Sequence, residues 1–439
     1  MRTRIIAAGG LAVLMFIGGA VLLSSGGASF GGERGKRRPP PSLAGTEAVP
    51  VADIDATIEA VQDRVGSGAA GASDFASLGS AYVQKARATA EPSYYNLAAR
   101  ALRKAIRSQP QNLSAVLGMG ELALGRHDFA AARRWARKAL AVDAQNGTAY
   151  GILGDAAVEL GRYRDAFRSF QRMIDLRPSL SSHARVSYAR ELTGDVAGAI
   201  ASMRRGVVAG ATAADKAWAQ NQLGDLFFNS GRLEDAERAY RSALALAPDF
   251  VPPDAGLGRV EAARGSFVPA IRRFEGIVDR YPLPQYVTTL GDLYATTGRD
   301  EESRRQYALV VAQGELFEAA GVIPDVEVSL FLADQGHDPR SAVRLARAQY
   351  AARPSVRVAD ALAWSLFKSG RYKEAREYSI RALTLGTSDA SYHYHAGMIA
   401  EALRDDGAAR RHLSRALAIN PHFSILDSPR AERVLRGLR

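Results

Sequence analysis

Few side chains in this sequence have the types and spacing that catalysis requires. Gly27-Ala28-Ser29-Phe30-Gly31 matches the G-x-S-x-G string of a nucleophilic serine. That string works only at a sharp strand-to-helix turn, with an acid and a histidine placed later in the chain. Here it lies in a Gly- and Ser-rich stretch directly after an apolar run. We therefore expect this serine to have no catalytic role.

The histidines are the next candidates, because four of the seven lie near the C-terminus: His393, His395, His412 and His422. Clustered imidazoles can hold a metal ion. However, His393 and His395 are two residues apart on a predicted helix and point about 200° apart. The chain also lacks cysteine, which excludes thiolate zinc sites and iron–sulfur clusters. The sequence predicts no metal, no cofactor and no enzyme activity.

Composition favours a folded, helical chain that carries a basic charge. Hydrophobic residues make up 47% of the 439 residues and charged residues 23%. This length is too great for one ordinary core unless the chain is a repeat array. The net charge of +11 comes from arginines scattered over most of the predicted helices. We do not expect a nucleic-acid partner, because no basic patch with interleaved aromatics stands out.

The N-terminus resembles a membrane or export segment. Arg2 and Arg4 precede an uncharged run from Ile5 to Leu23, which would span about 28 Å as a helix. Residues 1–28 are therefore predicted to be a transmembrane anchor or a signal peptide cut after Ala28. The basic start favours a membrane-anchored protein with its folded part on the extracytoplasmic side. Secretion after signal cleavage is the alternative.

A linker and a leading helix follow this segment. Residues 29–50 are rich in Gly, Pro and Arg, which predicts an extended linker. Residues 51–73 are predicted to form a leading helix and a loop. The apolar residues expected on one face of that helix are Ile54, Ile58, Val61 and Val65.

The rest of the chain repeats with a period of 34 residues. Each unit has a small residue in its first helix, a glycine at the turn, an alanine and an aromatic in its second helix, and a proline before the next unit. These residues are Gly154, Gly161, Ala166, Phe170 and Pro178; Gly224, Gly231, Ala236, Tyr240 and Pro248; and Gly258, Gly265, Ala270, Phe274 and Pro282. We expect the first glycine to allow close helix crossing and the second to adopt a left-handed turn.

These positions resemble the tetratricopeptide repeat family. The resemblance extends over residues 74–423 in units of roughly 34 residues. The units are 74–110, 111–146, 147–180, 181–213, 217–250, 251–284, 284–317, 327–355, 356–389 and 390–423. The resemblance implies an all-α, right-handed α-solenoid of about ten helix-turn-helix repeats. Residues 424–439 are then a C-terminal cap or tail. The Arg- and Ala-rich, Lys-poor usage suggests a bacterial source.

In the resembled family, the first helix of each pair lines a concave groove that binds a partner. Matching repeat positions give the groove candidates Asp155, Trp218, Asn221, Asp225, Phe228, Asn229, Asp292, Trp364, Phe367 and Tyr394, together with Arg259, Asp360 and Met398. Aromatics and amides there suit an extended or helical peptide. The alternative is that the tryptophans and Phe367 pack between adjacent repeats.

The groove candidates also indicate the charge of the ligand. Asp155, Asp225 and Asp292 occupy positions near those where carboxylate-binding members of the family hold an acidic C-terminus. Aspartates would repel a carboxylate, so a ligand with basic segments fits better. The sequence thus predicts a non-enzymatic scaffold that binds a protein or peptide and contacts a membrane through its N-terminus. The rival hypothesis is an accessory subunit of cell-envelope polysaccharide synthesis or export.

Overall fold

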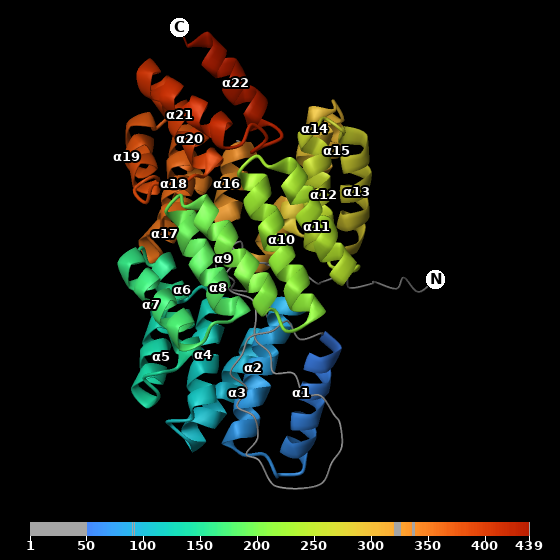
Figure 1. The fold of residues 1–439 in the computed structure, drawn as a ribbon, viewed down its shortest axis with the longest axis vertical. Coiled ribbons are helices and arrows are strands. Elements are labelled where there is room, and N and C mark those ends of the chain that lie inside the picture. Colours follow the sequence, from blue (N-terminus) through green and yellow to red (C-terminus); the bar gives the residue numbers. More distant parts are fainter. Residues whose placement is uncertain (1–50, 90, 92, 320–325, 336–338, 439) are drawn as a thin grey trace. The chain divides into compact units, whose positions relative to one another are not determined.

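The computed structural model describes residues 51–89, 91, 93–319, 326–335 and 339–438. Every regular element in these residues is an α-helix, as predicted (Figure 1). The predicted anchor or signal, the linker and the serine string at 27–31 lie outside the described residues. Within the described ranges, the helices are all too short or too polar to cross a lipid bilayer.

The described residues divide into two compact units, a first unit that ends at Ala156 and a second unit that begins at Ala157. The helices up to the boundary are α1 (Val51–Gly66), α2 (Ala72–Thr89), α3 (Ser93–Ser108), α4 (Leu113–Gly125), α5 (Phe129–Val142) and α6 (Gly147–Glu159), the last of which contains the boundary.

The second unit continues the same succession of helices. They are α7 (Tyr163–Leu176), α8 (Leu180–Leu192), α9 (Val196–Ala209), α10 (Ala213–Asn229), α11 (Leu233–Leu246), α12 (Val251–Ala263), α13 (Phe267–Arg280), α14 (Pro284–Thr296), α15 (Asp300–Ala319), α16 (Val326–Gln335), α17 (Pro339–Ala352), α18 (Val356–Lys368), α19 (Tyr372–Ala382), α20 (Ala390–Ala402), α21 (Asp406–Ile419) and α22 (Asp427–Gly437).

Pairs of consecutive helices, from α2 and α3 to α20 and α21, fall at the ten predicted repeats. Helices within a pair pack on each other, and first helices of successive repeats also pack together, as α10 does with α8 and α12. This is the arrangement of an α-solenoid, in which each repeat buries its apolar face on its neighbours. The solenoid prediction is confirmed.

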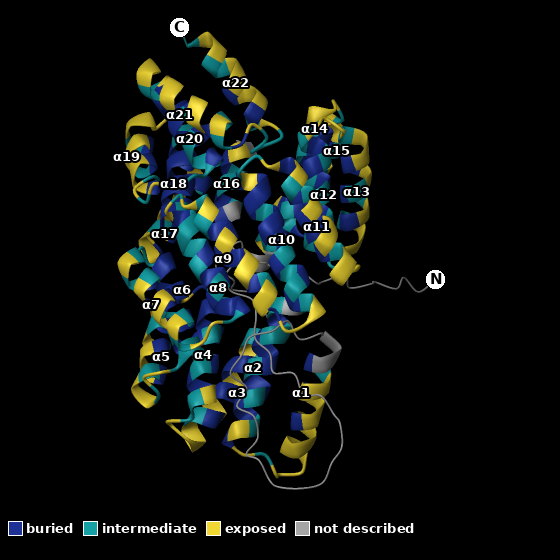
Figure 2. Ribbon diagram, viewed as in Figure 1, coloured by how far each residue is buried: buried dark blue, intermediate teal, exposed yellow. Residues whose placement is uncertain are grey.

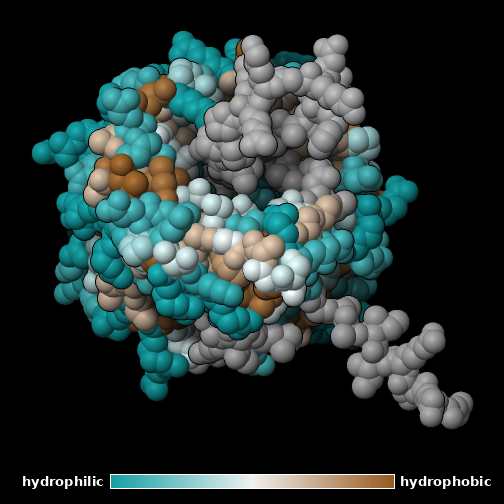
Figure 3. Space-filling model, turned by 90° about the horizontal axis from the view of Figure 1, so that it is seen from below, coloured by the Kyte–Doolittle hydropathy of each residue, from teal (hydrophilic) through white to brown (hydrophobic). Residues whose placement is uncertain are grey.

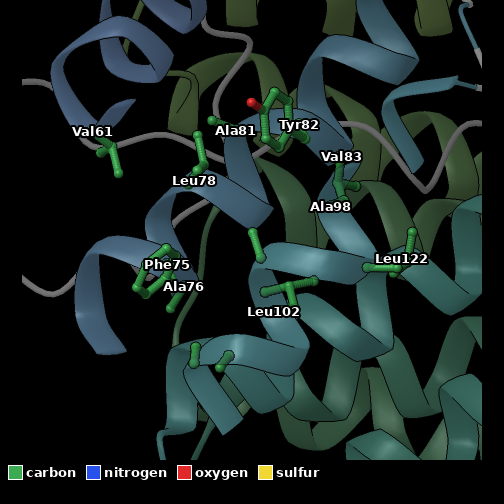
Figure 4. Packing of buried hydrophobic residues seen from close by; sticks show 14 of the residues in the cluster. Val61, Phe75, Ala76, Leu78, Ala81, Tyr82, Val83, Ala98, Leu102 and Leu122 are labelled. Carbon is green, nitrogen blue, oxygen red and sulfur yellow. The ribbon is translucent and has the colours of Figure 1, made fainter. Parts of the chain in front are cut away.

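The leading helix α1 packs on α2, the first helix of the first repeat. Ile54, Ile58 and Val61 are buried in one apolar cluster with Phe75, Leu78 and Tyr82 of α2. Figure 4 shows Val61 together with these three α2 residues. Val65 belongs to the same helix but is 36% exposed. Val65 lies in the last turn of α1, so the buried stripe ends one turn earlier than the sequence pattern suggested.

The glycines of the repeat have the roles that the sequence predicts. Gly161, Gly231 and Gly265 have φ angles of +67°, +73° and +76° at the turn between paired helices. This left-handed conformation favours glycine, which has no Cβ to collide with the backbone. At the helix crossing, a Cβ on Gly258 would lie 2.6 Å from the Phe274 ring, and a Cβ on Gly224 would meet Tyr240.

Burial differs between the two helices of a pair. In α18 ten residues from Val356 to Leu366 are buried, whereas α19 buries only three. Figure 2 shows this as a dark α18 beside a largely yellow α19. First helices therefore make the inner layer of the second unit, and second helices make the outer layer.

Candidate functional site

The first helices of the second unit gather acidic side chains, and we call this surface the inner face. It comprises Glu191 of α8, Asn221 and Asp225 of α10, Arg259 of α12, Asp292 of α14, Asp334 of α16 and Asp360 of α18, with Asp389 and Asp427 at the starts of α20 and α22. Several of these acids are close enough to raise one another's pKa.

Asp225 is held in a network that balances its charge. The Tyr240 hydroxyl donates to Asp225 Oδ1 at 2.8 Å, and the Arg259 guanidinium pairs with the same carboxylate. Arg259 also donates to the Tyr240 oxygen at 2.9 Å. Gly224 leaves the space that lets the Tyr240 ring reach this position. Asn221 Nδ2 donates to Asp225 at 3.1 Å, while Asn221 Oδ1 is buried without a partner.

Asp292 repeats the aspartate–tyrosine pair but lacks the arginine. The Tyr307 hydroxyl donates to Asp292 Oδ1 at 2.7 Å, across the same spacing of 15 residues. Gly291 again leaves room, since a Cβ there would lie 2.5 Å from the Tyr307 ring. Among the described residues Asp292 makes no ion pair. Burial, with repulsion from Asp334 and Asp427, raises the pKa of Asp292 to about 7.

Asp334 is the most accessible acid of the inner face, with 44% of its side chain exposed. It accepts a hydrogen bond from Trp364 Nε1 at 2.7 Å and lies 3.1 Å from Lys368 Nζ. Trp364 itself is 1% exposed and stacks on Phe367 and His395, with ring centroids 4.8 Å and 4.1 Å away. Trp364 therefore packs between repeats, as the alternative interpretation of the aromatics proposed.

A second acidic group connects α8 with the start of α20. Burial, with repulsion from Asp389 and Asp225, raises the pKa of Glu191 to about 7. Burial, with repulsion from Asp360, also raises the pKa of Asp389. His395 Nδ1 lies 2.9 Å from Asp360 Oδ2, while Asp360 Oδ1 is buried without a partner. The inner face is thus acidic in a chain whose net charge is +11.

The predicted groove residues have different fates in the structure. Asp155, Asn221, Phe228, Trp364 and Tyr394 are buried, Trp218, Asp225, Asp292 and Phe367 are partly buried, and Asn229 is exposed. The structure brings Asn221, Asp225 and Asp292 to the inner face of the second unit, whereas Asp155 lies in the first unit. The partly buried and exposed members remain the candidates for ligand contact.

Four acidic residues of the inner face were missed by sequence reasoning: Glu191, Asp334, Asp389 and Asp427. Asp389 and Asp427 lie at helix starts outside the repeat positions that were considered, so no periodic signal marks them. Asp334 lies in the last turn of α16. Their closeness to Asp292 and Glu191 depends on tertiary packing.

The C-terminal histidines do not gather into one site. His393 Nδ1 lies 3.2 Å from His412 Nδ1, whereas His395 pairs with Asp360. Burial, with the positive charges of nearby groups, lowers the pKa of His393 to about 4. Within the part of the chain that the structure describes, three or more histidine and carboxylate side chains do not converge as metal ligands would.

Models of known protein families match the sequence at several of the helix pairs. Two tetratricopeptide repeat models match the chain, one over residues 217–250 and the other over residues 93–147, 152–216 and 361–422. The chain carries tetratricopeptide repeats. The tetratricopeptide matches fall on both units and on most of the predicted repeats. No curated protein matches the sequence significantly.

Several solved structures are similar to this chain at low sequence identity. TTC0263 from Thermus thermophilus is 20% identical, covers 37% of this chain and 87% of its own, and has a TM-score of 0.34. A chain of the APC/C hetero-tetramer Cut9–Hcn1 is 13% identical, with coverage of 88% of this chain and 90% of its own, and has a TM-score of 0.37. YrrB, described as having an unusual peptide-binding site, is 18% identical, with coverage of 39% and 88% and a TM-score of 0.28.

Proposed function

We propose that this tetratricopeptide chain is a non-catalytic scaffold that binds a protein or peptide with basic segments on its inner face. The observation that carries the proposal is the acidic charge there. Asp334 and Asp427, which belong to two other helices, both repel the charge of Asp292. Within the described residues, Asp334 is the one of these three that lies beside a lysine. A Lys or Arg side chain of a ligand would relieve this repulsion.

Among the described residues, the exposed large hydrophobic side chains are scattered over several helices. Exposed large hydrophobic residues such as Val208, Val268 and Ile380 lie on different helices. On the face shown in Figure 3, hydrophilic side chains predominate and hydrophobic ones form only small patches. Since large apolar patches usually mark hydrophobic docking sites, this surface is more consistent with a ligand recognised by charge and hydrogen bonds.

The N-terminal segment completes the proposal. Residues 1–28 would tether the scaffold to a membrane, with the repeats on the extracytoplasmic side, and residues 29–50 would act as the spacer. Fractionation of source cells tests this part: the chain should be found with the membranes and should be digested by a protease added outside. Recovery from the medium in a shortened form would contradict the anchor.

Binding of basic peptides tests the central part. The full chain is titrated with a labelled Lys- and Arg-containing peptide and with a matched peptide in which each basic residue is replaced by Glu. We expect binding of the basic peptide only, and weaker binding at high salt, because ions screen charge pairs. Binding that is equal for both peptides, or insensitive to salt, would count against the proposal.

Two matched double variants test whether the peptide binds at the inner face. At pH 8, where Asp292 is ionised, Asp292→Asn with Asp334→Asn removes two inner-face charges, and we expect roughly a tenfold loss of affinity. The control is Asp165→Asn with Glu234→Gln, which removes two charges from second helices α7 and α11. An equal loss in both double variants would indicate that binding depends on net charge alone.

A further inference from the structure

Repeats that are far apart in the sequence touch at three places in the second unit. At the first, Val356 N–H donates to the Tyr163 hydroxyl oxygen at 2.6 Å. Gly161, in the turn between α6 and α7, lies so close to the loop before α18 that a Cβ on it would be 2.6 Å from the Pro354 carbonyl oxygen. Val356 is 4% exposed and belongs to one apolar cluster with Phe170 and Leu192.

The second and third contacts repeat this arrangement one repeat later each time. The Ser388 hydroxyl lies 3.5 Å from the Gly194 carbonyl oxygen, and the Gly386 carbonyl oxygen occupies the space that a Cβ on Gly194 would need. Asn420 Nδ2 donates to the Phe228 carbonyl oxygen at 2.9 Å, and Asn420 is 1% exposed.

The three contacts have nearly the same register. The hydrogen-bonded residues are 193, 194 and 192 positions apart in the sequence. Three successive turns of early repeats thus meet three successive loops of late repeats: the turns before α7, α9 and α11 meet the loops before α18, α20 and α22. Because this spacing is nearly constant, the solenoid of the second unit completes a superhelical turn in which its early repeats contact its late repeats. We call these three the closure contacts.

The closure contacts also bring together acids of the inner face. Glu191 lies one turn before Gly194, and Asp389 follows Ser388, so the second contact places their like charges close to each other. Asn229 acts to lower the pKa of Glu191, against burial and repulsion, and the cation Arg357 acts to lower the pKa of the neighbouring Tyr188 and Tyr392. Repulsion between Glu191 and Asp389 opposes closure, and a cation bound between them would remove that repulsion.

We propose that the closure contacts hold the second unit as a closed turn and that this turn opens to admit a ligand to the inner face. The opening step rests on the proposed function, whereas the closed turn does not. Glycine at positions 161 and 194 is needed for two reasons, the left-handed turn and the closeness of the facing loop. Gly265 and Gly298 share the first reason only, with φ angles of +76° and +75° and no atom within 4 Å of an added Cβ.

These glycines supply a matched test in the full chain. Because the protein has no cysteine, Thr193→Cys and Thr384→Cys provide the only two labelling positions, both exposed, one on each side of the second contact. Pulsed electron spin resonance then measures the distance between two nitroxides. We expect a single short distance in the otherwise unchanged chain and in Gly298→Asn, and a longer, broader distribution in Gly194→Asn. Asparagine is chosen because it tolerates the left-handed conformation.

Either of two results would overturn the closed turn. One is a long, broad distribution before any glycine is changed, and the other is an equal change in Gly298→Asn and Gly194→Asn. If Gly194→Asn fails to fold, Tyr163→Phe with Asn420→Ala removes two closure hydrogen bonds without altering a left-handed residue. This variant is expected to lengthen the distance, with the exposed Tyr281→Phe as its control.

The opening step has its own readout. Association of the basic peptide should be several-fold faster with Gly194→Asn than with Gly298→Asn. An unchanged rate in a variant whose nitroxide distance has increased would overturn the opening step and leave the closed turn standing. Absence of peptide binding in every variant, with the distances as expected, would instead count against the proposed function.

Discussion

At the scale of single residues, the chemistry of this protein lies in how its buried carboxylates are partnered. Asp225 and Asp292 both accept a tyrosine hydroxyl hydrogen, but only Asp225 also has an arginine. Arg259 lies 34 residues, or one repeat, after Asp225. The residue 34 positions after Asp292 is Val326, which carries no charge. The two sites therefore differ in charge although their local geometry is the same. Asp292 is the better probe of the inner face.

Asp292→Asn should change how stability depends on pH. The folded-state pKa of Asp292, about 7, lies above its value of 3.8 as a free side chain. The folded state therefore binds this proton more tightly than the unfolded state does. The resulting contribution to the free energy of unfolding is fully present below pH 3.8 and is lost as the pH rises to about 7. Asparagine still accepts from Tyr307 and does not titrate. We expect the melting temperature of the variant, relative to the parent, to be higher at pH 8 than at pH 5. A difference that is constant with pH would contradict this.

At the scale of helices and turns, small residues decide how closely the pairs pack. Gly224 faces the Tyr240 ring, whereas Gly276 is exposed in the middle of α13 with no atom within 4 Å of an added Cβ. The two glycines are thus a natural pair for separating packing from helix propensity.

Alanine at these two glycines should have opposite effects. Gly224→Ala forces Tyr240 to move and is expected to cost about 1–3 kcal/mol of unfolding free energy. Gly276→Ala meets nothing and should add about 0.5–1 kcal/mol, because alanine loses less backbone entropy in a helix. Denaturant unfolding measures both changes. If both variants changed the unfolding free energy in the same direction, the helices that cross at Gly224 would pack less closely than the structure shows.

The turn at Arg404 gives a third prediction. Most turns between paired helices have glycine, but Arg404 adopts φ of 59° with a side chain present. Arg404→Gly should therefore increase the unfolding free energy by roughly 1 kcal/mol. Gly370, at φ +77° in the preceding repeat, is the reverse control, and Gly370→Ala should lower it. No gain from Arg404→Gly would mean that the side chain makes contacts that offset the backbone cost.

At the scale of the whole molecule, the sequence predicted the features that recur with the repeat. Gly161, Tyr240 and Phe274 occupy periodic positions, and each has the conformation or burial that its position implied. The left-handed turns at His127 and Arg404 were not predicted, because these two residues adopt a positive φ without being glycine. The aromatic groove candidates were ambiguous because Trp364 and Tyr394 can either pack or bind, and only tertiary contacts distinguish the two.

Features that join distant repeats could not be predicted in this way. Asp427 reaches the inner face through the turn of the solenoid, and Asn420 meets Phe228 across 192 residues. Neither contact leaves a periodic trace in the sequence. The charge of the inner face and the closure contacts both depend on how many repeats complete a turn, which is set by small angles between successive helix pairs.

Affinity capture from the source cells tests the central claim most directly. The full chain, tagged after Arg439, is compared with the Asp292→Asn, Asp334→Asn variant and with the Asp165→Asn, Glu234→Gln control, and the recovered proteins are quantified. The account predicts a stoichiometric partner with a basic segment that is recovered by the parent and the control and largely lost from the inner-face variant. A partner that the inner-face variant retains in full would contradict binding at the inner face.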